Sequence, residues 1–177
     1  MLLTPRFVLR PMTREVVNAV LARDWSTVQQ LLGAPFPPEW RDAGWHWLAP
    51  MTAPGVEGER QVEWGNRLVL ARSPDHPGGD GPVLAEAGFH GPPDPSGWVE
   101  IGYQVVAASR RRGIAEEAAS GLIAWAQGRG VEGVEARIAP DNEPSRRLAA
   151  KLGFTLCGTA HHAELGEQLV YRRRLAP

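Results

Sequence analysis

The chain of 177 residues contains very little cysteine, lysine or tyrosine: Cys157 and Lys151 are the only residues of their types, and there are two tyrosines. A single cysteine excludes an intrachain disulfide, which fits a reducing compartment. Cys157 falls in a predicted strand, where we expect a small buried residue. The scarcity of lysine beside abundant arginine, alanine, glycine and proline indicates a GC-rich, bacterial genome.

Long apolar runs and an excess charge of either sign are also missing. No window approaches 18 uncharged apolar residues, so we expect no membrane span. The first residues contain no basic segment followed by an apolar stretch, so we expect no signal peptide and a cytoplasmic location. The formal net charge of −1 excludes a general polyanion binder.

Several nucleotide and metal motifs are absent as well. The sequence has neither G-x-G-x-x-G nor G-x-x-x-x-G-K-[ST], which disfavours dinucleotide binding and nucleoside triphosphate hydrolysis. No ligand-like cluster of histidine, cysteine and carboxylates appears, so we expect no metal site. The hydrophobic fraction of 43% is ordinary for a folded protein, and we expect one domain over residues 1–177.

Hydrophobic periodicity and turn residues predict an α/β (α+β) fold built on a mixed sheet. The segment 98–139 reads strand, helix, strand, which predicts a crossover with two parallel strands. A proline-stiffened loop is predicted at 33–40, a short helical stretch around 45–47, a polar linker or loop at 52–60 and a hairpin-type loop at 73–80. The predicted strands are 6–12, 67–72, 82–90, 98–106, 131–139, 154–160 and 167–175, and the predicted helices are 13–21, 24–32, 114–127 and 142–152.

The stretch "SRRRGIAEEA" at 109–118 concentrates positive charge at the start of a predicted helix. Free backbone N–H groups and the helix dipole favour an anion there, and a glycine lets the anion approach closely. Arginines add charge-assisted hydrogen bonds. The pattern indicates a phosphate-binding turn, with a plain solvated turn as the alternative. Glu116 and Glu117 would repel a phosphate, so we expect them to point away from it.

Two segments in order, "EIGYQVVAASRRRGIAEEAASGLIAWA" and "VEARIAPDNEPSRRLAAKLGF", resemble the GNAT superfamily of acyl-CoA-dependent N-acyltransferases. The opening "LTPRFVLRPMT" resembles the branch that includes ribosomal-protein N-terminal acetyltransferases. The specific resemblance covers 98–160. It rests on the Q/R-x-x-G-x-G/A signature, present as Arg110, Gly113 and Ala115, and on the N-x-x-S…G-F segment, present as Asn142, Ser145, Gly153 and Phe154.

This resemblance implies a mostly antiparallel, twisted sheet flanked by helices, with a central strand-helix-strand unit that binds acetyl-CoA as co-substrate. The strands 98–106 and 132–139 would splay apart, and the pantetheine arm would lie between them. The core 98–160 would hold the cofactor. The cofactor-binding residues would be Tyr103, Gln104, Val105, Val106, Arg110, Arg111, Arg112, Gly113, Ile114, Ala115, Asn142 and Ser145.

Acyl transfer to an amine needs a neutral amine, so a base is useful. Glu100 shares a strand face with Gly102 and Gln104 and is our candidate; the alternative is a surface carboxylate paired with an arginine. By resemblance, Ser145 would help protonate the departing thiolate; the alternative is a contact at the helix start. Residues 142–154 contain no tyrosine, which leaves the general acid open, and Tyr103 fits a cofactor wall better than an acid.

The acceptor side is predicted in segment 24–60, for a small-molecule or peptide amine. Its aromatic residues could form a binding wall; the alternative is a hydrophobic mini-core. Glu39, Asp42 and Glu86 could attract an amine. The isolated histidines, His46, His76 and His90, are interpreted as surface or satisfied polar residues. The aromatic residues concerned are Trp25, Phe36, Trp40, Trp45 and Trp47.

Two other functions compete with catalysis. A non-catalytic acyl-CoA-binding sensor or partner module would keep the phosphate turn but tolerate loss of Glu100 and Ser145. A nucleic-acid binder could use the arginine pairs and triplets at 110–112, 146–147 and 172–174, but the net charge and the lack of interleaved aromatic residues argue against it. A homodimer through the last strands is an expectation from the family resemblance.

Overall fold

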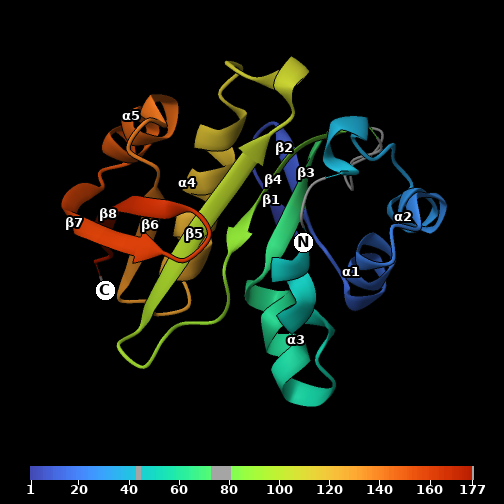
Figure 1. Cartoon of the computed structure of the whole chain (residues 1–177), viewed down its shortest axis with the longest axis horizontal. Coiled ribbons are helices and arrows are strands. Elements are labelled where there is room, and N and C mark those ends of the chain that lie inside the picture. Colours follow the sequence, from blue (N-terminus) through green and yellow to red (C-terminus); the bar gives the residue numbers. More distant parts are fainter. Residues whose placement is uncertain (43–44, 73–80, 177) are drawn as a thin grey trace.

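The computed structural model describes residues 1–42, 45–72 and 81–176, and within them one sheet of eight strands crosses the molecule in the order β1-β2-β3-β4-β5-β6-β8-β7 (Figure 1). The strands are β1 Leu2–Leu3, β2 Phe7–Pro11, β3 Asn66–Ala71, β4 Val83–Phe89, β5 Trp98–Val105, β6 Gly133–Ile138, β7 Thr155–His162 and β8 Gly166–Arg174. The helices are α1 Arg14–Leu21, α2 Trp25–Leu32, α3 Gly55–Trp64, α4 Ile114–Gln127 and α5 Glu143–Lys151, with 3-10 turns η1 Pro38–Trp40, η2 His46–Thr52 and η3 Ala107–Ser109.

The helix ends lie where the capping residues predict them. The side chains of Thr13, Asp24 and Asn142 each accept a hydrogen bond from a backbone N–H in the first turn of their helix. Gly33 ends α2 in the left-handed region, with φ at 62°. These local interactions explain why α1, α2 and α5 match the predicted ranges so closely.

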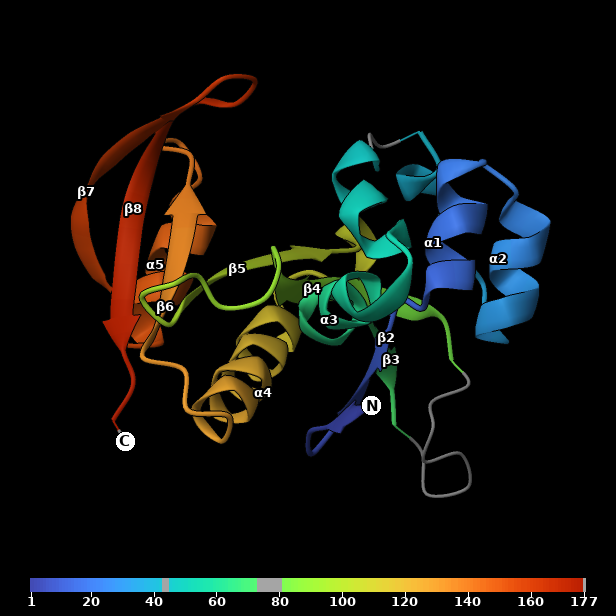
Figure 2. The same cartoon turned by 90° about the horizontal axis from the view of Figure 1, so that it is seen from below.

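The two faces of the sheet are covered by different helices (Figure 2). On one face, Phe7, Leu9, Val69 and Ile101 pack with the buried stripe of α4. On the other face, Leu68 and Leu70 pack with residues of α1, α2 and η2. The strand alternation of side chains therefore separates two hydrophobic clusters, and the sheet lies between them.

The parallel pairing of β5 with β6 is short. The two strands pair only over Trp98, Val99 and Glu100 of β5, although β5 runs on to Val105 and β6 to Ile138. Beyond Glu100 the strands diverge, as the family resemblance implied. The sheet thus contains a gap next to the second half of β5, and this gap positions the site.

Two predictions of local structure were wrong or incomplete. The segment 52–60 is not a linker, because η2 ends at Thr52 and α3 begins at Gly55. Its two glycines and many polar residues hide the helix, which is held by close packing: a Cβ on Gly58 would lie 1.6 Å from the carbonyl oxygen of Ala53. The short strand β1 carries no periodicity that the sequence could reveal. The predicted loop 73–80 lies outside the described residues.

Cys157 is exposed, so the prediction of a buried cysteine was also wrong. β7 is the last strand of the sheet, and most of its residues are exposed. The pairing of β7 with β8 skips Cys157 between Leu156 and Gly158. An edge strand with a bulge leaves such a side chain in solvent.

Four of the aromatic residues predicted in segment 24–60 form a mini-core rather than an open wall, and the side chain of the fifth, Trp47, lies outside the part that the structure describes. Phe36 stacks on Trp25, and its ring centroid lies 6.1 Å from that of Trp40 and 6.0 Å from that of Trp45. Phe36, Trp40 and Trp45 are all buried. Clustering of this kind supports the long connection between α2 and α3.

Trp40→Ala tests this structural role. We expect the free energy of unfolding to fall by about 3–5 kcal/mol, since a fully buried ring is replaced by a cavity. Urea denaturation measures the change. Val56→Ala, at an exposed position of α3, is the control. A loss below about 1 kcal/mol for Trp40→Ala would contradict the mini-core.

Candidate active site

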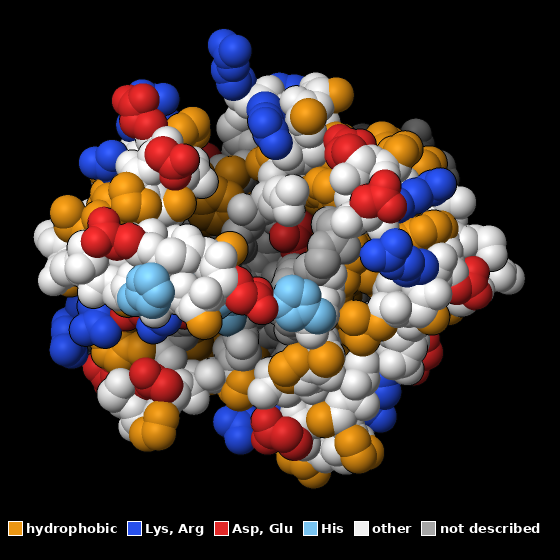
Figure 3. Space-filling view, in the orientation of Figure 1, with side chains coloured by type: hydrophobic (Ala, Val, Ile, Leu, Met, Phe, Trp, Pro, Cys, Tyr) orange, Lys and Arg blue, Asp and Glu red, His pale blue; other side chains and the backbone are white. Residues whose placement is uncertain are grey.

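A cavity of about 670 Å³ opens on the sheet face that η2 covers, between η2, the end of α3 and the β7–β8 hairpin. Figure 3 shows it as a hollow near the middle of this face, with acidic and histidine side chains around it. The lining residues within the described part of the chain are Trp45, His46, Pro50, Met51, Gln61, Gly65, Asn66, Glu86, Phe89, His90, Gly91, Gly102, Tyr103, Gln104, His162, Glu164 and Leu165.

Two glycines make room in the sheet beneath this cavity. Gly88 of β4 and Gly102 of β5 lie directly opposite each other. A Cβ on Gly102 would lie 2.6 Å from His90 Nε2, and one on Gly88 would lie 2.5 Å from the Cα of Asn66. The imidazole of His90 therefore lies over Gly102, and any larger residue there would displace it.

His90 and Glu100 form a pair at one end of the glycines. His90 Nδ1 lies 3.1 Å from Glu100 Oε1, and the backbone N–H of His90 donates to the carbonyl of Glu100. Arg137 of β6 reaches the same carboxylate, with Nε 3.4 Å from Oε2. Burial raises the pKa of Glu100, but the hydrogen bond and charge of His90, with the charges of Arg137 and His162, hold it below its ordinary value. Glu100 is thus ionised at neutral pH. It does not line the cavity itself but contacts His90, which does.

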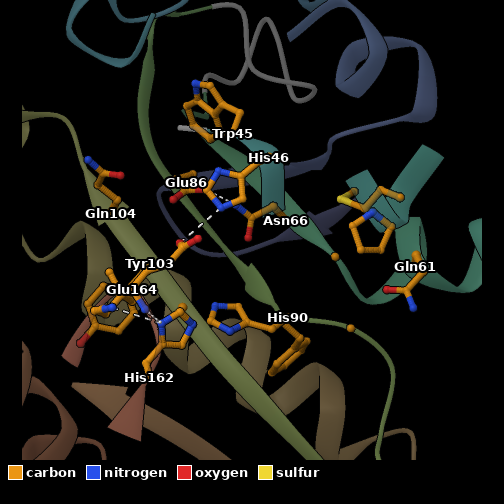
Figure 4. A pocket seen from close by; sticks show the side chains of 17 residues that line it. Trp45, His46, Gln61, Asn66, Glu86, His90, Tyr103, Gln104, His162 and Glu164 are labelled. Atoms are coloured by element: carbon orange, nitrogen blue, oxygen red, sulfur yellow. Dashed lines mark hydrogen bonds and ion pairs between the residues drawn. The ribbon is translucent and has the colours of Figure 1, made fainter. Parts of the chain in front are cut away.

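Glu86 lies at the other end of the glycines, opposite Gln104. Its Oε2 accepts a hydrogen bond from the side-chain amide of Asn66 (Figure 4). Burial raises the pKa of Glu86 to about 7, against the opposing charge of His90. The two carboxylates of the site therefore have opposite pKa shifts, because burial dominates at Glu86, whereas at Glu100 the hydrogen bond from His90 and the nearby charges outweigh burial.

Tyr103 and Ser145 meet across the gap between β5 and β6. Burial raises the pKa of Tyr103, and a hydrogen bond between the two side chains opposes that shift. Ser145 also donates its backbone N–H to Asn142 Oδ1 at 3.2 Å. Although 142–154 contains no tyrosine, a tyrosine of β5 thus lies within hydrogen-bonding reach of Ser145.

The backbone of β5 presents free hydrogen-bonding groups to the same gap. His90 N–H bonds to Glu100 and Val106 N–H to Leu84, so the even-numbered residues of β5 pair with β4. In an antiparallel ladder the alternate residues point the other way. Tyr103 and Val105 therefore direct their N–H and C=O groups toward β6, where pairing has already ended.

The basic turn leads from β5 into α4. Gly113 precedes the helix with φ at 72°, and no side chain caps the first turn. Arg6 holds the turn from behind, because its guanidinium donates to the carbonyls of Arg112 and Gly113. Glu117 is engaged by Arg6 at 2.6 Å. With the carbonyls held in this way, the N–H groups at the start of α4 remain available to an anion.

The acidic residues of α4 are both paired: Glu117 binds Arg6 behind the turn, and Glu116 binds Lys151 of α5 at 2.7 Å. Arg110 folds back, with Nε donating to the carbonyl of Val105. Arg111 and Arg112 are exposed. Basic side chains project at the top of the face in Figure 3, over the start of α4 in Figure 1.

The other arginines do not combine with this turn into one basic surface. Arg147 pairs with Glu143, while Arg172 and Arg174 bind Glu135 and Glu132. Charges neutralised in this way give little support to a nucleic-acid interface.

The structure thus brings the predicted residues into two groups joined by the gap. Gly113, Ala115 and the arginines lie at the start of α4. Glu100, Tyr103, Gln104 and Ser145 lie near the cavity or at the gap. Ile114 is buried, so only its backbone N–H can face a ligand. Among the described aromatic side chains of segment 24–60, Trp45 alone lines the cavity.

Sequence reasoning missed three residues of the site: His90, Asn66 and Arg6. His90 was interpreted as isolated, but the antiparallel pairing of β4 with β5 places it beside Glu100. Knowledge of that register would have found it. Asn66 and Arg6 come from distant parts of the chain and carry no motif.

The raised pKa of Glu86 makes a prediction for stability. An acid whose pKa is higher in the folded state destabilises the fold as pH rises from about 4.5 to 7. Glu86→Gln removes this cost, so its stability relative to the unmodified protein should improve between pH 5 and pH 8, by on the order of 3 kcal/mol at most. Urea denaturation at both pH values measures it, with Glu39→Gln on an exposed side chain as control. An unchanged difference would contradict the buried, weakly paired state of Glu86.

Within the described residues, no helix is both long and apolar enough to cross a membrane. The same part of the chain holds no group of three or more His, Cys, Asp or Glu side chains arranged for a metal ion.

Comparison with known proteins gives a consistent result. A curated relative, the uncharacterized N-acetyltransferase YjdG of Bacillus subtilis (strain 168), is 41% identical over 75 residues, which is 42% of this chain and 45% of that protein; the match thus spans less than half of the relative. A putative GnaT-family acetyltransferase from Bordetella pertussis is 26% identical with a TM-score of 0.62, over 98% of this chain and 99% of that one. A putative ribosomal-protein-serine acetyltransferase from Vibrio cholerae shares the fold, with a TM-score of 0.61 at 18% identity over 98% of this chain and 96% of that one.

The family model of the acetyltransferase (GNAT) domain matches residues 6–155, which is most of the chain and includes the turn, the gap and both carboxylates. The GNAT resemblance found in the sequence is confirmed. The chain belongs to the GNAT acetyltransferase family.

Proposed function

We propose that this protein transfers the acetyl group of acetyl-CoA to a primary amine held in the cavity, by direct attack of the amine on the thioester. The observation that carries the proposal is the gap between β5 and β6, which connects the turn at Gly113 with the cavity over Gly102. Membership of the GNAT family supports acetyl-CoA as the co-substrate.

The pyrophosphate fits the start of α4. The left-handed Gly113 leaves space for it, the first turn has no side-chain cap, and Arg111 and Arg112 add positive charge. The N–H groups of Tyr103 and Val105 and the carbonyl of Tyr103 can then pair with the amides of the pantetheine arm, whereas the carbonyl of Val105 accepts from Arg110 Nε at 3.3 Å. This arrangement directs the thioester toward the glycine side of the cavity.

Glu100 assists removal of the amine proton through His90. A primary amine has an ordinary pKa near ~10.4, so it needs a proton acceptor at neutral pH. His90 lines the cavity and Glu100 does not. The carboxylate at 3.1 Å orients the imidazole and stabilises the cation that forms when the imidazole accepts the proton. Glu100 thus acts as a positioning residue.

Ser145 and Tyr103 serve the departing thiolate. They meet at the gap, and the raised pKa of Tyr103 keeps its hydroxyl protonated at neutral pH. A protonated hydroxyl can donate a hydrogen bond to the sulfur as negative charge develops there.

Several finer predictions remain proposals. The acceptor is a small molecule or a peptide amine, and the protein works in a bacterial cytoplasm, supported by the bacterial sources of its relatives and by its single cysteine. A homodimer stays a prediction. The alternative, a binding module without turnover, predicts acetyl-CoA binding with no release of free CoA when amines are added.

The turn can be tested by charge reversal. Gly113→Glu should weaken acetyl-CoA binding by roughly 100-fold or more, since it adds negative charge to the turn and strains a backbone held at φ 72°, and its Cβ would lie 3.2 Å from Nη2 of Arg6, which holds the turn. Gly130→Glu is a matched control: Gly130 also has a positive φ of 74°, a Cβ added there would meet no heavy atom within 4 Å, and it lies at the other end of α4. Calorimetric titration measures both. Equal affinities of the two variants would exclude this phosphate site.

The His90–Glu100 pair can be tested by a double-mutant cycle. His90→Asn and Glu100→Gln should each lower kcat by roughly 100-fold, and the double variant should lose little more, because the two residues act as a unit. Release of free CoA is the measurement. Glu135→Gln is the control, since it removes another partner of Arg137 at 2.9 Å without touching His90. If the losses of kcat in the two single variants add up in the double variant, the two residues do not act as a unit. If Glu100→Gln is inactive and His90→Asn remains active, Glu100 is the direct base.

A further inference from the structure

The cavity has an acidic group that the acetyl transfer does not use. Glu86 lies at its floor and Glu164 at its rim, whereas none of the described lining residues is lysine or arginine. Glu164 pairs with His46 of η2 at 3.6 Å, and both of these side chains are exposed. Glu86 is buried, and among the described residues Asn66 is its only hydrogen-bond partner. A buried carboxylate with one neutral partner favours a cation beside it.

The position of Glu86 separates it from the base. Glu86 lies in β4 and His90 directly follows this strand, so their Cα atoms are four residues apart, which corresponds to about 13 Å. The imidazole of His90 leans back over Gly102, close enough for its charge to act on Glu86. Gly88 lies between them, with Gly102 opposite. Figure 4 shows Glu86 and Asn66 at one end of the pocket with Trp45 and His46, and His90 apart from them. A ligand lying over the glycines can reach both ends.

We propose that the acceptor is an amine that carries a second, cationic nitrogen, and that Glu86 binds this nitrogen while the reacting amine faces His90. This rests on the proposed function, because it assigns the substrate class of the same site. Asn66 is then a positioning residue, since its amide holds Oε2 of Glu86 and leaves Oε1 for the ligand. The arriving cation favours the ionised carboxylate even though burial raises its pKa to about 7.

The aromatic ring of Trp45 lies at the same end (Figure 4) and is fixed by the mini-core, since its Nε1 donates to the carbonyl of Trp40 at 2.8 Å. A rigid indole beside a carboxylate is a favourable place for an organic cation. The mini-core thus contributes one wall of the cavity that Glu86 and Gln104 also line.

The test compares α,ω-diamines of three to six methylenes with n-alkylamines of the same lengths, in the full-length protein with acetyl-CoA. We expect the best diamine to exceed its matched monoamine in kcat/KM by roughly 10- to 100-fold, as a charge-assisted contact provides. In Glu86→Gln this ratio should fall to near one. The exposed Glu39→Gln is the control and should keep the ratio.

Three results would overturn the proposal. The first is the absence of a diamine preference in the unmodified protein. The second is a preference that Glu164→Gln abolishes and Glu86→Gln keeps, which would place recognition at the rim. The third is an equal loss of kcat for diamine and monoamine in Glu86→Gln, which would give Glu86 a role in the chemistry.

A second arm distinguishes small diamines from peptides. An Ala-Lys peptide and an Ala-norleucine peptide, both with free α-amines, present the same reacting group with and without the second cation. If the Ala-Lys peptide is preferred and Glu86→Gln removes the preference, the same recognition operates on a peptide acceptor. If the diamines are preferred but the Ala-Lys peptide is not, the acceptor is a small diamine.

Binding measurements separate this proposal from the proposed function. Calorimetric titration of each amine into the protein saturated with CoA needs no turnover. Tighter binding of the diamine by roughly tenfold, lost in Glu86→Gln, supports the subsite even if no acetyl transfer occurs, whereas equal binding of both amines contradicts it. Turnover of monoamines alone would support acetyl transfer while overturning the second cation.

Discussion

The end of β-pairing between β5 and β6 after Glu100 is the constraint on which the site depends. Up to that residue the sheet is closed, and α4 and η2 lie on opposite faces. Beyond it, the backbone of Tyr103 and Val105 no longer pairs with β6, and the gap in the sheet connects its two faces. The proposed phosphate turn lies at the start of α4, while the cavity opens on the η2 side. A long, flexible co-substrate can therefore reach a cavity that its charged end never enters.

Even- and odd-numbered residues of β5 have different roles, because successive residues of a strand point in opposite directions. Even-numbered residues of β5 pair with β4 and direct their side chains to the cavity, which places Glu100, Gly102 and Gln104 in one row. Odd-numbered residues offer their backbone to the gap. The two carboxylates also differ in their side-chain partners, since Glu100 contacts a histidine and an arginine, and Glu86 contacts an amide. One carboxylate is thereby suited to orient a base, and the other to receive a cation.

Local signals predicted most of this fold. Caps at Thr13, Asp24 and Asn142 fixed the helix starts, and the phosphate turn stood out because an anion site is made of consecutive residues. Contacts between distant residues could not be predicted in this way. His90 acquires its role only through the register of β4 on β5, and Arg6 only by packing behind the turn. Helix α3 and the exposure of Cys157 depend on tertiary packing and on the strand order, which periodicity does not contain.

The most direct test of the gap is amide hydrogen exchange along β5, with and without acetyl-CoA. The N–H groups of Gly102 and Gln104 pair with β4 and should exchange slowly in both states. Those of Tyr103 and Val105 should exchange quickly in the free protein and become strongly protected when acetyl-CoA is bound, because pantetheine then takes the place of the missing strand. Protection of Tyr103 and Val105 that does not change on binding, while acetyl-CoA is bound, would contradict the central claim that the gap between β5 and β6 holds the co-substrate.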